Sequence, residues 1–220
     1  MASAGKVQEK SPEPITKDIV GEGEKPSFIP YPKIGDKLEH VPIHVRPDLL
    51  YYVSRMGFLP YTIKLYLHVP WIAEFLFKLN NAVMRDERNG LSEHLKYRLS
   101  MVASRDNECT YCTAHHALTF RRRWSYSDSD IEHLLKMDQP GDEREAVAME
   151  FVHQTSLDAA GVTDELRQRL AKHFTPQECM EIVLVAGFWK MYNIMHTAMG
   201  MPLEDPVVPD AHWVGVGPSQ

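Results

Sequence analysis

The sequence has few cysteines, no excess of basic residues and no long apolar run. Its 220 residues include three cysteines, an odd and low number that argues against the disulfide framework of a small secreted protein. A formal net charge of -6 offers no broad basic surface for nucleic acid. No stretch is apolar for long enough to span a bilayer, and the N-terminus lacks the apolar part of a signal peptide. We therefore expect a soluble cytoplasmic protein with small-molecule or protein partners, and no nucleic-acid or membrane partner.

Alternation of apolar and polar residues, the pattern of β-strands, is also missing over any useful length. Apolar residues instead recur at helical spacing, so we predict an all-α fold. A hydrophobic content of 44% in 220 residues suffices for one large domain. We place this multi-helix domain at 46–205, after a Pro-rich arm at 1–45 that is disordered or extended, and before an irregular tail at 206–220. The apolar residues of the arm lie on its own domain or on a neighbouring subunit, unless the arm is a solvated linker.

Helix signals divide this domain. Pro47 and Pro70 stand at positions typical of a first helical turn, and Ser92, Ser127 and Thr175 can accept free backbone N–H groups. With the apolar periodicity, these signals predict helices at 46–56, 61–68, 70–88, 92–105, 109–123, 127–137, 142–157, 163–173 and 175–199. The last is so apolar from 180 to 199 that we expect a buried central helix.

A weak internal similarity links two parts of this pattern. When Val102-Ala103 is aligned with Val185-Ala186, the segment 192–199 falls on 109–116 and keeps its helical character, but not the two cysteines. The similarity indicates either a degenerate internal helical repeat or a chance resemblance between apolar helices.

Thiols and imidazoles converge in the stretch Cys109-Thr-Tyr-Cys112-Thr-Ala-His115-His116. On a helix, Cys109, Cys112 and His116 share one face, so the two thiols can form a disulfide. Residues 106–107, Asp and Asn, can cap this helix, whose first turn favours a thiolate. His116, one turn after Cys112, can take or return the thiol proton. A thiolate beside a second thiol is typical of a redox or nucleophilic site.

Three interpretations remain open from the residues alone. In the first, Cys112 attacks a peroxide or disulfide as a thiolate, Cys109 resolves the product as a disulfide, and His116 handles the proton. In the second, the same side chains bind zinc or another metal, although a closed structural site needs four ligands and no second CxxC pair follows. The third is structural packing of two small thiols and a core histidine.

The motif Cys109-x-Tyr-Cys112-x-x-x-His116, preceded by Leu99-Ser-Met-Val-Ala-Ser104 and Asn107, resembles the CxxCxxxH signature of the alkylhydroperoxidase D-like, or carboxymuconolactone decarboxylase, superfamily. The resemblance covers residues 57–205 and includes the closing Pro202-Leu-Glu204. It implies an all-α domain and a thiol-dependent peroxidase or other oxidoreductase, in which Cys112 attacks and Cys109 resolves. It also implies a homo-oligomer, a trimer or hexamer, that a protein dithiol reduces and that uses no organic cofactor or metal.

One position departs from that superfamily. Its proton relay usually contains a glutamate ahead of the first cysteine, and Tyr97 stands at the aligned position here. A phenol is a poor base at neutral pH but a usable hydrogen-bond donor, so we expect Tyr97 to point toward the cysteines and orient a water or His116. The change leaves two alternatives: a decarboxylase-like enzyme acting on a carbonyl or carboxylate substrate, and an interaction protein that senses redox state without turnover. The cysteine pair favours the redox enzyme, because decarboxylating relatives generally lack it.

Three arginines, Arg121 to Arg123, stand where the cysteine helix is expected to end. Cations at a helix C-terminus interact favourably with its free carbonyl groups. Helix-end electrostatics therefore explain these residues, and an anion or partner site is the alternative.

Overall fold

The computed structural model describes residues 27–35 and 38–216, and over these ranges it contains helices and no β-strand. The helices are α2 Arg46–Met56, α3 Tyr61–Tyr66, α4 Pro70–Arg85, α5 Glu93–Asp106, α6 Thr110–Trp124, α7 Asp128–Lys136, α8 Glu143–Leu157, α9 Asp164–His173 and α10 Pro176–Ala198, with the 3-10 helices η1 Ala159–Gly161 and η2 Val208–Gly215. The all-α prediction is confirmed. Residues 1–26, which hold much of the predicted arm, lie outside the described part. Among the described helices, none is both long and apolar enough to cross a membrane.

The helices begin and end where the sequence satisfies free backbone groups. Ser92 accepts a backbone N–H before α5, and Ser127 and Thr175 form reciprocal capping boxes before α7 and α10. Gly57 ends α2 in the left-handed conformation, with a φ of 75°. These boundaries agree with the positions that the sequence predicts.

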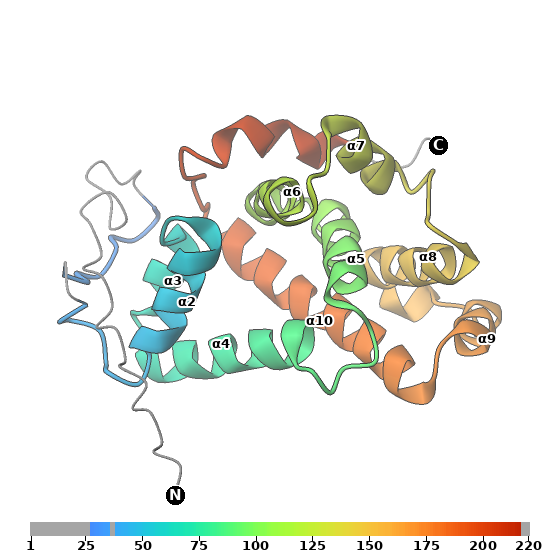
Figure 1. The fold of residues 1–220 in the computed structure, drawn as a ribbon, viewed down its shortest axis with the longest axis horizontal. Coiled ribbons are helices and arrows are strands. Elements are labelled where there is room, and N and C mark those ends of the chain that lie inside the picture. The colour runs from blue at the N-terminus through green and yellow to red at the C-terminus, as the bar shows by residue number, and fades with distance from the viewer. Residues whose placement is uncertain (1–26, 36–37, 217–220) are drawn as a thin grey trace, which may run out of the picture.

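Helix α10 crosses the middle of the molecule and packs against α4, α5, α6 and α8 (Figure 1). Its inner face is buried through residues such as Ile182 and Val185. The prediction of a buried helix at 180–199 is wrong for the opposite face, where Met180 and Leu184 are exposed. Both faces are apolar, so periodicity alone could not tell them apart.

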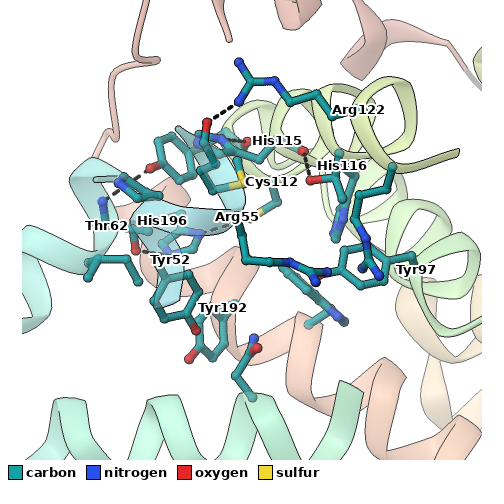
Figure 2. A pocket seen from close by; sticks show the side chains of 18 of the residues that line it. Tyr52, Arg55, Thr62, Tyr97, Cys112, His115, His116, Arg122, Tyr192 and His196 are labelled. Carbon is teal, nitrogen blue, oxygen red and sulfur yellow. Dashed lines mark hydrogen bonds between the residues drawn. The ribbon is translucent and has the colours of Figure 1, made fainter. Parts of the chain in front are cut away.

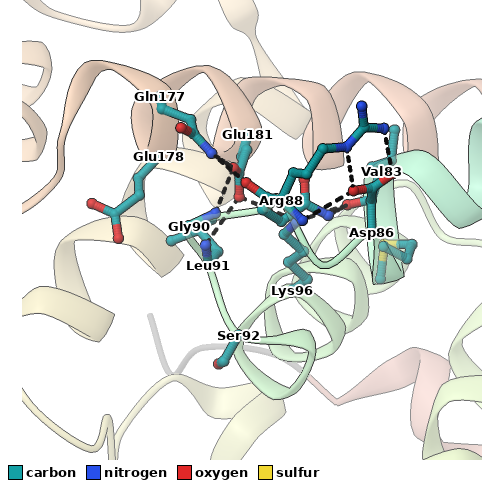
Figure 3. A network of polar contacts seen from close by, with 12 residues as sticks. Val83, Asp86, Arg88, Gly90, Leu91, Ser92, Lys96, Gln177, Glu178 and Glu181 are labelled. Carbon is teal, nitrogen blue, oxygen red and sulfur yellow. Dashed lines mark hydrogen bonds and ion pairs between the residues drawn. The ribbon is translucent and has the colours of Figure 1, made fainter.

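A buried ion pair joins the connection between α4 and α5 to α10 (Figure 3). Lys96 on α5 and Glu181 on α10 are 3.2 Å apart, and the Lys96 side chain is fully buried. The Glu181 carboxylate also accepts the backbone N–H groups of Gly90 and Leu91, at 2.8 and 3.0 Å. Lys96 donates to the Val83 carbonyl at 2.8 Å. Because these partners come from three segments, the network fixes the start of α5, the helix that leads to the cysteines, against α10.

The described part of the N-terminal arm lies on its own domain. Ile34, Leu38 and Val41 are buried in one cluster with Leu49 of α2 and Phe77 of α4. Burial of large aliphatic side chains is the main favourable term in such packing. Over these residues, the arm is therefore not a solvated linker.

The predicted irregular tail contains the 3-10 helix η2, which lies over α6 (Figure 1). Trp213 in η2 is buried, and its indole N–H donates to Asp210 Oδ1 at 2.9 Å. Asp210 also forms an ion pair with Arg121 of α6. The expectation of an irregular tail is wrong for these residues, because contacts with a helix far away in the sequence order them.

Candidate functional site

The two predicted thiols lie at the start of α6 and contact each other. Cys109 is the N-cap residue, and its Sγ accepts the backbone N–H of Cys112 at 3.3 Å. The two Sγ atoms are 2.7 Å apart, and both cysteines are free and buried. The expectation that Asp106 and Asn107 cap this helix is wrong, because they end α5 and Glu108 then turns the chain with a φ of 54°. Cys109 therefore caps the helix with its own sulfur.

The imidazole that contacts the thiols comes from α10 and not from the cysteine helix. His196 Nδ1 lies 3.0 Å from Cys112 Sγ, as Figure 2 shows. On the other edge of the ring, Nε2 contacts Thr62 Oγ1 at 2.5 Å and the Tyr66 hydroxyl at 2.6 Å, both on α3. An Nε2–H that donates to one of these hydroxyls leaves Nδ1 as an acceptor. His196 can then take the proton of Cys112.

The two thiols differ in acidity. The hydrogen bond from Cys112 lowers the pKa of Cys109 to about 5 against the effect of burial, and a hydrogen bond to His196 acts in the same direction. Burial raises the pKa of Cys112 well above its ordinary value. Burial also lowers the pKa of His196, which favours the neutral imidazole. Cys109 is therefore the more acidic thiol of the pair.

A second chain of buried hydrogen bonds closes the site. The Tyr111 hydroxyl donates to Glu204 Oε1 at 2.8 Å, and His115 Nε2 lies 3.1 Å from Glu204 Oε2. The backbone N–H of Tyr61, at the start of α3, donates to the same carboxylate. Burial is the largest single effect and alone would raise the pKa of Glu204 and lower that of His115, but the charge of the partner and the hydrogen bonds together lower the pKa of Glu204 and raise that of His115. This ion pair holds the segment after α10 and the start of α3 against the cysteine helix.

A pocket opens beside Cys112, with walls from α2, α3, α4, α5, α6 and α10. Its inner cavity has a volume of about 120 Å³, and the space including its open mouth is about 870 Å³. Cys112 and His196 line it, whereas Cys109 is not among the described residues that do. A small molecule in the pocket would thus meet Cys112 before Cys109.

The other two predicted site residues, His116 and Tyr97, line this pocket on the side away from His196 (Figure 2). His116 is 3% exposed, its Nε2 has no hydrogen-bond partner within the described part of the chain, and burial lowers its pKa to about 3. Tyr97 meets His116 edge to face, with ring centroids 5.8 Å apart, and its hydroxyl accepts from Arg85 at 2.8 Å. His196 therefore makes the contact with Cys112 that the sequence predicted for His116. The Tyr97 hydroxyl pairs with Arg85 and not with His116.

Cys109, Cys112 and His196 could also hold a metal ion. Their Sγ, Sγ and Nδ1 atoms all lie within 4.8 Å of one another, and thiolate and imidazole suit zinc. Two sulfur atoms on one tetrahedral zinc would be about 3.8 Å apart, given Zn–S bonds of about 2.3 Å. The observed separation of 2.7 Å is shorter than this, so the two sulfur atoms do not have the spacing of a pair of zinc ligands.

Sequence reasoning did not find His196, Thr62, Tyr66 or the role of Glu204. His196 is separated from Cys112 by 84 positions, so no local motif joins them. One signal was available: Thr62 and Tyr66 share a helix face at i and i+4. Glu204 was noticed only through the family resemblance.

Comparison with known proteins bears on the fold. No family model matches the sequence, and no curated protein matches it either. Among solved structures, the alkylhydroperoxidase AhpD core of an uncharacterized peroxidase-related protein from Ralstonia eutropha JMP134 has a TM-score of 0.72 at 22% identity, covering 84% of this chain and 96% of its own. A peroxidase-related protein from Silicibacter sp. TM1040 gives the same values, and the debrominase Bmp8 has a TM-score of 0.68 at 20% identity, covering 78% and 92%. The resemblance inferred from the cysteine motif is confirmed at the level of structure, and the chain has the all-α fold of alkylhydroperoxidase D-like proteins.

Proposed function

We propose that this protein is a thiol-dependent oxidoreductase that reduces hydroperoxides. The observation that carries the proposal is the chain of contacts from Cys109 to Cys112 at 2.7 Å and from Cys112 to His196 at 3.0 Å, beside a pocket that Cys112 lines. Two thiols in contact, one of them with a depressed pKa, and an adjacent imidazole are the parts that a dithiol peroxidase needs.

The reaction would proceed in two steps. Cys112 transfers its proton to His196 Nδ1, and its thiolate attacks one peroxide oxygen, breaking the O–O bond. The other oxygen leaves as an alkoxide, which takes the proton back to become an alcohol, and Cys112 becomes a sulfenic acid. The Cys109 thiolate then attacks Cys112 Sγ, which forms the disulfide and breaks the S–O bond, and the hydroxide that leaves takes a proton from solvent to become water. A protein dithiol would supply the two electrons that restore both thiols.

The acidity of the two thiols is compatible with these roles. The lowered pKa of Cys109 favours its thiolate, and a thiolate next to Cys112 is what the second step needs. Cys112 ionises only when a base accepts its proton, and His196 is in contact with it. Attack by Cys112 and resolution by Cys109, the order that the resemblance implies, thus remains our proposal. His116 and Tyr97 act in it as residues that contact the substrate.

A peroxide-consumption assay with dithiothreitol as reductant tests the proposal. The parent protein should consume an organic hydroperoxide at a steady rate, Cys112→Ser should lose this activity, and Cys179→Ser should retain it, because Cys179 lies outside the pocket. Disulfide formation without steady consumption would favour the redox-sensing alternative. Absence of both, with turnover of a carbonyl or carboxylate substrate, would favour the decarboxylase-like alternative.

We also propose that the chain forms a homo-oligomer. Trp71 and Phe75 on α4 are 62% and 69% exposed, and Met180 on α10 is 55% exposed. A neighbouring subunit would cover such exposed large apolar side chains. A monomeric mass in light scattering at micromolar concentration would contradict the proposal.

A further inference from the structure

We propose that the pocket beside Cys112 selects hydroperoxides that carry a carboxylate group on an apolar body, such as fatty-acid hydroperoxides. This inference rests on the proposed peroxidase function and names its substrate class. Arginine side chains would bind the carboxylate, and aromatic side chains would pack against the apolar body, which leaves the peroxide free to reach Cys112.

The first observation is the charge of the pocket wall. Arg55, Arg85, Arg122 and Arg123 all line the pocket, and no aspartate or glutamate is among its described lining residues. Arg55 comes from α2, Arg85 from α4 and the other two from the end of α6. Three separate helices therefore bring positive charge to one cavity, which is the arrangement expected for recognition of an anion.

The second observation is that these charges are incompletely neutralised. Glu93 is the one carboxylate paired with them in the described structure, with contacts of 2.6 Å to Arg123, 3.3 Å to Arg55 and 3.4 Å to Arg85. Arg122 donates only to a backbone carbonyl. Three guanidinium groups thus share one carboxylate and Arg122 pairs with none among the described residues, which leaves an excess of three positive charges at the pocket.

Helix-end electrostatics do not account for this arrangement. Arg121, in the same run at the end of α6, forms ion pairs with both Asp128 and Asp210 and does not line the pocket. Of the two arginines that do line it, Arg123 pairs with both carboxylate oxygens of Glu93, whereas Arg122 has no carboxylate partner among the described residues. The difference within one helical turn points to a ligand for Arg122.

The third observation concerns the rest of the wall. Tyr52, Ile63, Trp189 and Tyr192 provide apolar and aromatic surface. His116 Nε2 and Trp189 Nε1 are buried and have no hydrogen-bond partner in the described part of the chain, although buried polar atoms nearly always have one. A ligand with an apolar body and polar oxygen atoms would satisfy both features.

The test compares linoleic acid hydroperoxide with its methyl ester, below their micelle concentrations. The two molecules differ in the one charge and share the peroxide and the chain. In the parent protein we expect kcat/KM to be about 10-fold higher for the acid, the size of one charge-assisted hydrogen bond, and this ratio should fall as salt rises. Equal kcat/KM values for acid and ester would overturn the inference and leave the peroxidase proposal standing.

Two substitutions that change the charge of the pocket in opposite directions test whether the arginines cause the preference for the acid. Arg122→Gln should bring the acid-to-ester ratio several-fold closer to one, and Glu93→Gln, which removes the competing carboxylate, should raise it. Arg167→Gln on α9, whose arginine is exposed and pairs with Asp164, is the matched control and should keep the parent ratio. A ratio that neither pocket variant changes would contradict the inference. Circular dichroism confirms that each variant is folded.

A binding experiment separates failure of this inference from failure of the peroxidase proposal. Calorimetry with Cys112→Ser should show linoleic acid binding about 10-fold more tightly than methyl linoleate. If neither hydroperoxide is consumed and this preference is present, the carboxylate site stands and the proposed reaction is wrong. If the preference is absent here as well, the carboxylate site is wrong.

Discussion

Two buried polar regions of this molecule differ in how completely their atoms are paired. In the first, around Lys96 and Glu181, the carboxylate accepts two backbone N–H groups and the ammonium group, and the ammonium group also reaches a backbone carbonyl. In the second, the pocket beside Cys112, His116 Nε2 and Trp189 Nε1 have no partner in the described structure. Both regions are enclosed by the same helices, α5 and α10.

The difference indicates which region is structural and which binds a ligand. A fully satisfied buried network rigidifies the elements that it joins, and removing one member leaves a charge without a partner. Unsatisfied polar atoms in a cavity cost free energy in the empty protein and regain it when a ligand pairs with them. The Lys96–Glu181 region should therefore respond to substitution with a change in stability, and the pocket with a change in turnover.

The largest effect should come from the histidine that contacts the sulfur. We expect His196→Gln to lower kcat by about 10² to 10⁴-fold, the usual loss for a general acid-base. His116→Phe should change kcat by less than about 10-fold, because His116 makes no hydrogen bond to either sulfur and burial lowers its pKa to about 3. Steady-state peroxide consumption measures both. A larger loss of kcat in His116→Phe than in His196→Gln would assign proton transfer to His116, as the sequence predicted.

The next effect concerns stability. Lys96→Met keeps an apolar stem in place but leaves the Glu181 carboxylate without its cation, so we expect the free energy of unfolding to fall by about 3 to 5 kcal/mol. Chemical denaturation with circular dichroism measures this. The control is Lys136→Met, whose surface pair with Glu132 should contribute less than about 1 kcal/mol. Unchanged stability with lost turnover would mean that this region serves the reaction.

Local features of the fold could be predicted from the sequence because they depend on neighbouring residues. The caps at Ser92 and Thr175, and the contact between Cys109 and Cys112, involve residues within one turn of each other. The predicted cap at 106–107 was wrong because Glu108 adopts a left-handed conformation, which nothing in its residue type requires.

Contacts between distant segments could not be predicted in this way. His196 reaches Cys112 because α10 crosses α6 at that level, and the crossing depends on the packing of whole helix faces. The same reason explains why the 3-10 helix at 208–215 was not predicted. Its contacts are with α6, which is far away in the sequence. Tyr97 was placed in the correct pocket by the family resemblance, but its partner Arg85 lies on α4 and was not foreseen.

A smaller effect should appear in the dependence on pH. The pKa of Cys109 is lowered to about 5, so the thiolate forms above that pH and is lost as the pH falls through it. One pH unit below this value, about a tenth of the pair remains ionised, and we expect turnover to fall about 10-fold with it. Thiolate absorbance in the ultraviolet should show one step near pH 5 that Cys109→Ser abolishes. A first step above pH 8 would show that the thiols do not share a charge in this way.

The smallest effect should come from Tyr97, where this sequence departs from the resembled superfamily. Tyr97→Phe removes the acceptor for one Arg85 N–H, at 2.8 Å, while Asn80 still accepts from the same guanidinium at 2.6 Å. A single hydrogen bond of this kind contributes about 1 kcal/mol, so we expect kcat/KM for a carboxylate-bearing hydroperoxide to fall about three- to five-fold, mainly through KM. The methyl ester should lose less, because Tyr97 acts through the position of Arg85. A fall of 100-fold or more in kcat for both substrates would instead place the Tyr97 hydroxyl in proton transfer, and would make the pocket wall part of the reaction itself.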